Sequence, residues 1–486
     1  MKIMFTERSL RSELEQALLD GILRRWYPLV VDREYGGYYT NIRSDWTLPP
    51  EQEKMIVTQA RHLWTTSKMA AFTDTPALYE PIARHGYEFL RDVMWDETYG
   101  GFYQIRNRQG LASEVNGWRD EKRAYGNAFA IYALAAFYAQ TRDPEVLEFA
   151  KQAFVWIEDH AFDPRWKGYF EFITREGEPF DRSSTYKTIA SDGNELGFKD
   201  QNSSIHLLEA YTELYNVWKD ERLREQLHGL LVLIRDTMVA EKGYLRLFFH
   251  PDQSPVSFRD APDAVREENF GLDHVSFGHD YETAFLMLEA SYALGLENDT
   301  RTLAVARKML DHALANGWEQ GVGGFVDGGY YFKGKNRCSI VKDTKNWWAQ
   351  AEGLNALLMF SRIYPKGDYY ESFLQQWEYI KRYILDHEKG DWYEGGIDKE
   401  PGFKNGPRSH IWKCTYHTCR TLMNCIALLS DAAEVRPGVA HKRIEMDEFI
   451  NHWKHSTVPA GKANLLETSN TLSDDHRPGD ESRSIG

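Results

Sequence analysis

Six short segments that combine glycine with aromatic residues recur along the chain at similar intervals. They are 35–39, 99–103, 167–170, 242–245, 323–326 and 390–393. Counted from one aromatic residue in each (38, 102, 169, 244, 325 and 392), the spacings are 64, 67, 75, 81 and 67 residues. Glycine permits a tight turn and aromatic side chains cover a half-buried strand, so each segment predicts a short β-hairpin. A repeat of this length indicates one supersecondary unit used six times.

Each interval between two of these segments has room for two helices, and apolar residues recur there with a helical period. The pattern is clearest in 122–141 and 144–160, where Asp143 can cap the second helix and Pro144 can take its first position. The other predicted pairs are 54–73 with 76–93, 201–218 with 220–240, 280–295 with 298–316, and 345–364 with 367–387. Single helices are predicted at 7–26 and 413–432, which makes twelve.

The two single helices lie at opposite ends of the array, and this favours a closed ring over an open solenoid. An open solenoid needs polar capping repeats, whereas two terminal helices can pair and complete a sixth unit. We therefore predict an all-α fold, an (α/α)6 barrel of twelve helices with short β-hairpins in the loops between pairs. The predicted barrel domain spans 1–441. Residues 442–486 lose apolar periodicity and predict a polar, flexible tail.

Charge and cysteine content narrow the class of protein. The formal net charge of −15 argues against nucleic acid or an anionic membrane as a partner, because both attract basic surfaces. The four cysteines lack paired zinc-ligand spacing, and no apolar run is long enough to cross a bilayer. The first residues also lack the apolar core of a signal peptide. We expect a cytoplasmic monomer or homodimer that binds neither nucleic acid nor a membrane.

Polar and aromatic residues gather near the start of the first helix after each hairpin segment. They are Arg61, Tyr125, Asn202, His206, His279, Glu282, Trp348, Glu352 and His417, with Trp412 just before the last helix. In a closed ring these first helices form the inner wall, so the side chains would surround one opening. Packing alone does not require the same phase in every repeat, and we predict a functional site there.

The residue types in this set suit proton transfer on a sugar. His279 and His417 come from distant parts of the chain, and two imidazoles suit a reaction in which one proton leaves and another is returned. Tryptophans beside carboxylates and amides are typical of sugar sites, since sugar C–H faces stack on rings and hydroxyls bond polar groups. Structural roles are the alternative: His206 as a hydrogen-bonded core histidine, and His279 with Glu282 as a surface pair.

Metal and nucleotide cofactors are not expected. His206, His279, His417 and a glutamate could supply metal ligands, but no HExxH-type spacing is present in the sequence. No GxGxxG segment follows a predicted strand, so a nicotinamide cofactor is not indicated. The small-molecule partner that we expect is the sugar itself.

The sequence resembles the N-acylglucosamine 2-epimerase family, most closely its cellobiose 2-epimerase branch. The resemblance extends from about Leu23 to about Leu429 and depends on six short motifs in the right order. The motifs are Arg61-His62-Leu63-Trp64, Tyr125-Gly126-Asn127-Ala128-Phe129, His206-x-Leu208-Glu209-Ala210-Tyr211-Thr212, Gly278-His279-Asp280-Tyr281-Glu282, Trp347-Trp348-Ala349-Gln350-Ala351-Glu352 and Trp412-Lys413-Cys414-x-Tyr416-His417. The resemblance implies an (α/α)6 barrel that acts as a sugar 2-epimerase or an aldose–ketose isomerase.

The resemblance also implies roles for single residues. His279 and His417 would form the acid/base pair, and Trp412 would stack on the sugar. The residues implied to bind or polarise the sugar are Arg61, Asn202, His206, Glu282, Trp348 and Glu352, and Tyr125 is a further candidate for substrate binding. Three positions depart from the cellobiose 2-epimerase pattern, with Ser204 in place of a histidine, Phe285 of a tryptophan and Thr415 of a proline. These departures bear on the choice of sugar.

We therefore expect an isomerase that interconverts C2 epimers of an aldose, or of the reducing-end sugar of a disaccharide, through an enediolate. The C2 proton is weakly acidic, so the carbonyl must be polarised, and Arg61 and His206 suit that task. The nearest alternative is an aldose–ketose isomerase of the mannose isomerase type on the same scaffold. A glycoside hydrolase that uses Asp280, Glu282 or Asp391, and a sugar-binding module without activity, are further alternatives.

Overall fold

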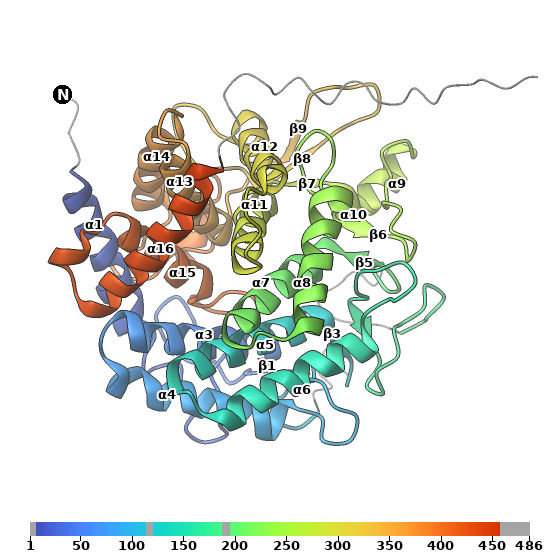
Figure 1. The fold of residues 1–486 in the computed structure, drawn as a ribbon, viewed down its shortest axis with the longest axis horizontal. Helices are drawn as coiled ribbons and strands as arrows, with labels where there is room; N and C mark the ends of the chain where they lie inside the picture. Colours follow the sequence, from blue (N-terminus) through green and yellow to red (C-terminus); the bar gives the residue numbers. More distant parts are fainter. Residues whose placement is uncertain (1–5, 113–119, 187–194, 457–486) are drawn as a thin grey trace, which may run out of the picture.

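Six inner helices form a closed ring around one axis in the computed structural model, which describes residues 6–112, 120–186 and 195–456 (Figure 1). Each inner helix packs on the next, and the contact between the last and the first closes the ring. In order they are α3 (Ile56–Phe72), α5 (Ala124–Thr141), α7 (Gln201–Val217), α11 (Phe277–Ala293), α13 (Trp347–Ile363) and α15 (Tyr416–Leu428). The predicted (α/α)6 barrel is confirmed, and the open solenoid is wrong.

An outer helix packs against each inner helix. Five outer helices follow their partners in sequence: α4 (Pro76–Phe89), α6 (Pro144–His160), α8 (Glu221–Leu233), α12 (Thr300–Asn316) and α14 (Tyr369–Tyr383). Short π-helical turns extend α4 and α8 over Leu90–Met94 and Ile234–Met238. The sixth outer helix is the N-terminal segment, formed by α1 (Glu7–Gln16), a π-helical stretch (Ala17–Leu23) and α2 (Arg24–Trp26). It contacts α15, so the terminal helices pair as predicted.

Aspartates start several of the outer helices. Asp143 accepts a hydrogen bond from the Glu145 amide at 3.1 Å, and Pro144 takes the first helical position. Asp220 and Asp299 cap α8 and α12 in the same way. The inner helices, in contrast, are buried on nearly all sides, because each is covered by two neighbours and an outer helix.

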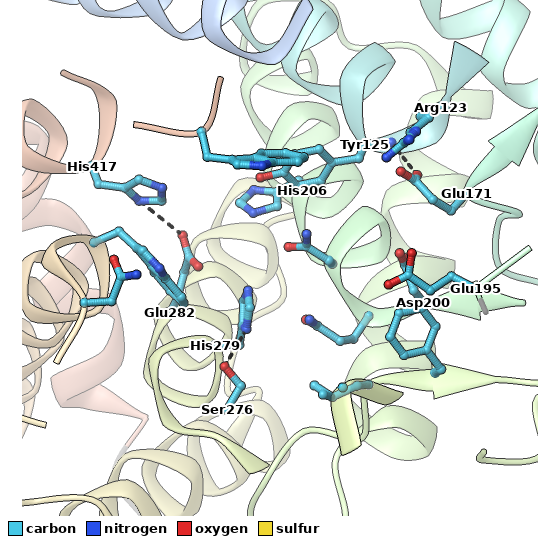
Figure 2. A pocket seen from close by; sticks show the side chains of 18 of the residues that line it. Arg123, Tyr125, Glu171, Glu195, Asp200, His206, Ser276, His279, Glu282 and His417 are labelled. Carbon is cyan, nitrogen blue, oxygen red and sulfur yellow. Dashed lines mark hydrogen bonds and ion pairs between the residues drawn. The ribbon is translucent and has the colours of Figure 1, made fainter. Parts of the chain in front are cut away.

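All six glycine–aromatic segments form tight hairpins at one end of the barrel. Each is closed by an antiparallel bridge: Val31–Tyr38, Trp95–Phe102, Phe162–Tyr169, Val239–Leu245, Trp318–Phe325 and Leu385–Trp392. Short strands link consecutive repeats, β1 (Lys54–Met55) with β2 (Ile105–Arg106), β3 (Lys122–Arg123) with β4 (Phe172–Ile173), β5 (Lys199–Asp200) with β6 (Phe248–Phe249), and β7 (Val275–Ser276) with β8 (Gly328–Tyr330) and β9 (Ser339–Lys342). This rim surrounds the N-terminal ends of the inner helices, where the pocket in Figure 2 lies.

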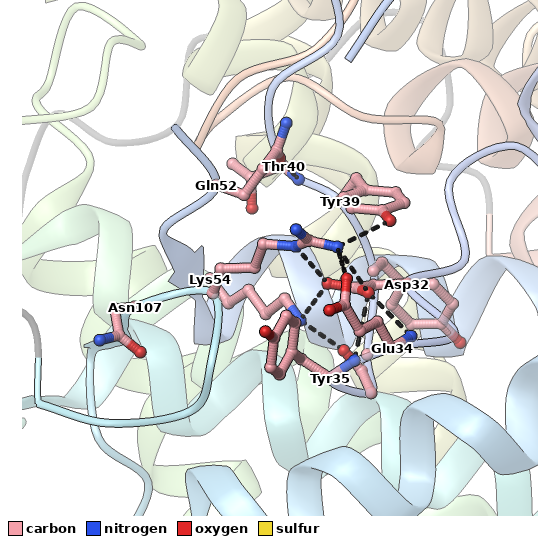
Figure 3. A network of polar contacts seen from close by, with 12 residues as sticks. Asp32, Glu34, Tyr35, Tyr39, Thr40, Gln52, Lys54 and Asn107 are labelled. Atoms are coloured by element: carbon pink, nitrogen blue, oxygen red, sulfur yellow. Dashed lines mark hydrogen bonds and ion pairs between the residues drawn. The ribbon is translucent and has the colours of Figure 1, made fainter. Parts of the chain in front are cut away.

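A buried lysine joins most inner helices to the hairpin before them. In the first repeat the Lys54 ammonium bonds the Asp32 carboxylate at 2.9 Å and the Gly36 carbonyl at 2.5 Å (Figure 3). Arg108, from the next repeat, bonds the same carboxylate at 3.1 Å. Equivalent pairs are Lys122–Asp96, Lys199–Asp163 and Lys345–Glu319. In the sixth repeat Lys413 instead bonds Asp391 of the hairpin, and Asp386, at the position of Asp32, pairs with Arg408. We call these contacts the lysine clips.

Three described α-helices were not predicted. α9 (Asp263–Glu268) and α10 (Phe270–Asp273) are short and lie in the long loop before β7. α16 (Pro437–His455) contacts α15, α13, α3 and α11, and it buries Met446, Phe449, Ile450 and Trp453. Residues 442–455 therefore belong to the packed fold, and the predicted start of the tail at 442 is wrong. The remainder, 457–486, lies outside the described residues. Within the described ranges, no helix is both long and apolar enough to cross a membrane.

The lysine clips should be essential to stability. Asp32→Asn keeps an oxygen for the Glu34 and Tyr35 amides but leaves the fully buried Lys54 ammonium without its counterion. We expect a loss of about 3–5 kcal/mol in the free energy of unfolding, measured by urea denaturation. Glu34→Gln is the matched control, because Glu34 pairs with the same Arg108 but is 62% exposed, and we expect at most about 1 kcal/mol there. Equal losses in the two variants would contradict the role of the clip.

Candidate active site

A pocket of about 480 Å³ opens at the rim end of the barrel, among the N-terminal turns of the inner helices. Nine of the ten predicted site residues line it: Arg61, Tyr125, Asn202, His206, His279, Glu282, Trp348, Trp412 and His417. The tenth, Glu352, lies behind His417 and bonds its imidazole. The structure thus brings together residues from all six inner helices or the loops before them.

Three histidines are held in the same way, through Nδ1. His206 Nδ1 lies 2.9 Å from Glu209, His279 Nδ1 lies 2.7 Å from the Ser276 hydroxyl, and His417 Nδ1 lies 2.6 Å from Glu352. In the described part of the chain the Nε2 atom of each ring makes no hydrogen bond to protein. Figure 2 shows the three rings gathered at one end of the pocket. All three are therefore oriented by a protein group and keep Nε2 for a bound molecule.

The two predicted acid/base histidines are neutral near pH 7. Burial lowers the pKa of His279 to about 3, and the nearby His206 and His274 act in the same direction. Burial also lowers the pKa of His417 well below its usual range, helped by Arg61 and Arg420. An imidazole that is neutral and presents Nε2 to the pocket can accept a proton.

A buried guanidinium connects the carboxylates beneath these histidines. Arg420 donates to Glu282 at 2.6 Å and lies 2.7 Å from Glu352, and it also bonds Glu209. Burial alone would raise the pKa of Glu209, but Arg420 and then His206 hold that pKa at about 2. Glu352 differs: burial, reinforced by the neighbouring Glu282, raises its pKa well above the usual value despite Arg420. We call Arg420 with these three glutamates the basal network.

The basal network does not fit a metal ion. Glu282, Glu352 and His417 do offer ligand atoms within 4.8 Å of one another. However, the guanidinium of Arg420 already bonds both carboxylates, and it supplies the positive charge that a cation would bring. The donor set is therefore balanced by protein groups.

Arg61 and a set of aromatic rings form the wall beside the histidines. Arg61 donates to the Trp412 carbonyl at 2.9 Å and to the Tyr125 hydroxyl at 2.8 Å. Its guanidinium also packs on the Phe129 ring, 4.3 Å from the centroid, which holds it in place. Trp348 lies beside both catalytic candidates, with ring centroids 4.8 Å from His279 and 5.8 Å from His417. Trp348 and Trp412 remain partly exposed in the pocket.

The far end of the pocket is acidic and was not predicted. Arg123, Glu171 and Asp200 line it, as do the rings of Phe172 and Phe248. Glu171 accepts a hydrogen bond from the Tyr125 amide at 2.9 Å, and Asp200 caps α7. Burial raises the pKa of both carboxyls, and the proximity of Asp200 raises that of Glu171 further. Figure 2 shows Arg123, Glu171 and Asp200 opposite the histidines.

Arg420 and Glu209, two members of the basal network, were also missing from the predicted site, although the sequence contains a signal for them. His206 precedes Glu209 by three positions, His279 precedes Glu282 by three, and His417 precedes Arg420 by three. This spacing on three inner helices places each partner one turn below its histidine. The acids at the far end have no such signal, because Glu171 comes from a loop and Asp200 from a strand.

The three departures from the cellobiose 2-epimerase pattern lie behind the pocket wall. Ser204 is buried and donates to the Asp200 carbonyl at 2.6 Å. Phe285 is buried against the Arg420 guanidinium, 5.3 Å away, and the Thr415 hydroxyl lies 3.1 Å from that of Tyr27. None of the three lines the pocket, so they affect sugar binding only through the residues in front of them.

Comparison with known proteins identifies relatives over most of the chain. A family model described as N-acylglucosamine 2-epimerase matches residues 37–419. The cellobiose 2-epimerase of Bacteroides fragilis is 30% identical over 431 residues, which cover 87% of this chain and 99% of the relative. The cellobiose 2-epimerase of Ruminococcus albus is 31% identical over 424 residues, covering 85% of this chain and 98% of the relative.

Solved structures share the fold. Cellobiose 2-epimerase from Bacillus thermoamylovorans superposes with a TM-score of 0.74 at 26% identity, covering 86% of this chain and 99% of that one. A D-mannose isomerase superposes with a TM-score of 0.72 at 20% identity, covering 85% and 97%. At 20% identity the second comparison supports the barrel alone.

Removal of Arg420, the cation of the basal network, should make the protein less stable as the pH rises. In Arg420→Met the three glutamates lose their counterion, and burial then favours their protonated forms. Stability should therefore fall as the pH rises through about 5, reaching a loss of about 3–5 kcal/mol at pH 7 by urea denaturation. Arg362→Met, which breaks a half-exposed pair with Glu7, is the control and should cost at most about 1 kcal/mol. A loss that does not change between pH 4 and 8 would contradict this role.

Proposed function

This chain belongs to the N-acylglucosamine 2-epimerase family, and on that basis we propose that it is a carbohydrate 2-epimerase. Its substrate would be an aldose, or the reducing-end sugar of a disaccharide, that is inverted at C2. The observation that carries the proposal is the arrangement of His279 and His417, which are fixed through Nδ1 and present Nε2 to one pocket from two inner helices. Inversion requires two bases on opposite faces of the reacting carbon, and this pair can supply them.

The open-chain sugar would lie between the aromatic wall and the histidines. Trp348 and Trp412 offer partly exposed faces for its C–H groups, while the buried side-chain oxygen of Asn202 has no partner among the residues that the structure describes. That oxygen can accept a hydrogen bond from a sugar hydroxyl. These contacts would hold C2 beside the two Nε2 atoms.

One histidine would remove the C2 proton, and the other would deliver a proton to the opposite face. The abstracting imidazole is neutral because burial lowers the pKa of both rings. The delivering group can draw on the His417–Glu352 pair, in which the raised pKa of Glu352 keeps a proton available beside Nδ1. Their roles would exchange when the reaction runs in reverse.

The enediolate that forms between the two steps carries negative charge on the oxygens of C1 and C2. Arg61, with its ordinary positive charge, and His206, held by Glu209, are the groups suited to stabilise it. Both are fixed before the sugar binds, Arg61 by Trp412 and Tyr125. Such preorganised donors stabilise developing charge more than mobile water does.

The far end of the pocket gives room for a second sugar ring. Arg123, Glu171 and Asp200 offer polar groups for its hydroxyls, and Phe172 and Phe248 offer apolar faces. The three sequence departures lie outside the pocket lining and do not block this space. We therefore favour a disaccharide such as cellobiose as the substrate, held with its reducing end at the histidines.

The proposal also includes the compartment and the assembly. All four cysteines are unpaired, and a reducing cytoplasm keeps thiols in this state. We keep the expectation of a cytoplasmic monomer or homodimer.

Incubation with sugars in D2O should distinguish the epimerase from its nearest alternative. We expect cellobiose, or a related aldose, to yield its C2 epimer with deuterium at C2, because the proton delivered comes from a group that exchanges with solvent. The products would be separated by chromatography and read by NMR. A ketose as the main product would instead establish an aldose–ketose isomerase, and release of monosaccharides would establish a hydrolase.

The two histidines should be separable by isotope exchange. In His279→Asn and His417→Asn we expect the epimerisation rate to fall by about 10²–10⁴-fold. Each variant should still exchange the C2 proton of the one epimer whose base remains, and the two variants should differ in which epimer exchanges. His160→Asn is the control, since His160 lies on the outer helix α6 and bonds the Gly177 carbonyl. Loss of exchange for both epimers in both variants would contradict the two-base arrangement.

A further inference from the structure

In three repeats, an amide at the fourth residue of the inner helix holds the preceding hairpin. Gln59 accepts from the Tyr38 amide at 2.7 Å and donates to the Tyr38 carbonyl at 2.9 Å. Asn127 holds Phe102 in the same manner, at 2.9 and 3.4 Å, and Gln350 holds Phe325 at 3.0 and 2.8 Å. We call this contact the amide hook. It is neutral and satisfies both polar groups of one backbone residue.

In the helix that carries His279, the hook position is an acid. Asp280 is the fourth residue of α11 and directly follows His279. Its Oδ1 accepts from the Leu245 amide at 2.8 Å, as the amides do in their hairpins. Among the described residues its Oδ2 has no hydrogen-bond partner at normal distance, and an ionised carboxylate cannot donate to a carbonyl. Among the six inner helices, α11 alone has a carboxylic acid at this position.

A second titratable group faces the acid from the outer helix. His312 of α12 places Nδ1 3.5 Å from Asp280 Oδ2, and its Nε2 lies 2.8 Å from the Tyr331 hydroxyl. Both Asp280 and His312 are buried. The other titratable groups that face the pair are Tyr244, Tyr331 and Cys338, with Lys242 over the Tyr331 ring at 4.8 Å. Burial raises the pKa of these three side chains, so they are uncharged near neutrality.

We propose that Asp280 is a positioning residue for His279, and that the ionisation of the Asp280–His312 pair sets how the first turn of α11 is held against its hairpin. Protonated, Asp280 can make both bonds of an amide hook. Ionised, it keeps the bond to the Leu245 amide and turns its second oxygen toward His312. His279 is anchored to Ser276, at the junction of β7 and α11, so a shift of this turn changes the aim of its Nε2 atom. The proposal depends on the proposed function, because His279 is taken as the base.

A stability argument supports a functional reason for the acid. Burial raises the pKa of Asp280 from its ordinary value to about 6, despite His312 and the Leu245 amide. The folded protein therefore binds this proton more tightly than the unfolded chain does, and stability falls as the pH rises from about 4 to about 6. A neutral amide would avoid that cost, as Gln59, Asn127 and Gln350 do in the other three repeats. Groups that reduce stability in this way are typical of functional positions.

The test uses Asp280→Asn, which converts the acid into the hook of the sister repeats, and measures kcat, KM and Tm between pH 4.5 and 8.5. We expect the Tm of the variant to rise relative to wild type as the pH passes from about 4.5 to 6.5. At pH 7.5 we expect kcat to fall by about tenfold or more with KM changed less than about threefold, since a small misplacement of a catalytic group is costly. The limb of the kcat profile near pH 6 should also disappear.

Three further variants separate positioning from simple packing. His312→Gln can keep a donor toward Asp280 but carries no charge, so the pKa of Asp280 should rise and the limb should move to higher pH. The double variant should be no worse than either single variant, because the two residues act as one unit. Asn127→Asp makes the reverse exchange on α5 and should lower Tm at neutral pH without adding a limb near pH 6 to kcat.

The outcomes are distinct. An Asp280→Asn protein with wild-type kcat at every pH would overturn the positioning role, as would effects of the two single variants that simply add. A Tm difference that does not change with pH would overturn the ionisation of the pair. If the wild-type chain turns over no sugar, the proposed function fails together with the positioning role, whereas the Tm profile still decides whether the pair ionises.

Discussion

The lysine clips are the constraint on which the open end of the barrel depends. A buried ammonium is tolerated only with a counterion and further acceptors. Each clip therefore brings a carboxylate of the hairpin, and in four repeats one of its backbone carbonyls, to the segment before an inner helix. Five repeats use it, and in the fourth Val275 occupies the place that corresponds to Lys54. That repeat carries His279, and Asp280 holds its hairpin without a lysine at the clip position. The candidate base His279 therefore lies in the repeat that lacks the lysine of the clip, where Asp280 bonds the hairpin.

Much of the fold could be predicted because the same sequence signals for turns and helix starts recur in each repeat. Glycine–aromatic segments mark the turns, and the Asp143–Pro144 pair marks a helix start, so the predicted 144–160 helix agrees with α6 (Pro144–His160). α16 was missed for a physical reason. Its sequence is polar, and its few apolar residues, Phe449 and Trp453 among them, become a buried face only against the far ends of the inner helices. A helix stabilised by a surface that other segments create leaves a weak local pattern.

The candidate site also contains some residues that the sequence predicts and others that it does not. His279, His417 and their neighbours could be found because each begins a helix at the same phase of the repeat. Arg420 could not be assigned its partners, since Glu209 and Glu282 lie 211 and 138 positions away in sequence. The acids at the far end come from a loop and from a two-residue strand, both too short to show a period. Sequence periodicity therefore predicts which helix faces meet, and leaves the pairing of charges between them to the folded structure.

The basal network explains how neutral histidines can remain oriented in a buried site. Burial lowers the pKa of both imidazoles, so the rings are uncharged and cannot be held by ion pairs. Each ring must therefore be held by a hydrogen bond at Nδ1. Glu209 can accept such a bond from His206, and Glu352 shares one with His417, but buried carboxylates repel one another. Arg420 offsets that repulsion from a single position between the three. His279 is the exception, because its Nδ1 partner is the neutral Ser276 hydroxyl and the nearest acid along its helix, Asp280, faces away toward His312. The two histidines of the pair are therefore tuned by different means, one by a charged network and one by the seating of its helix.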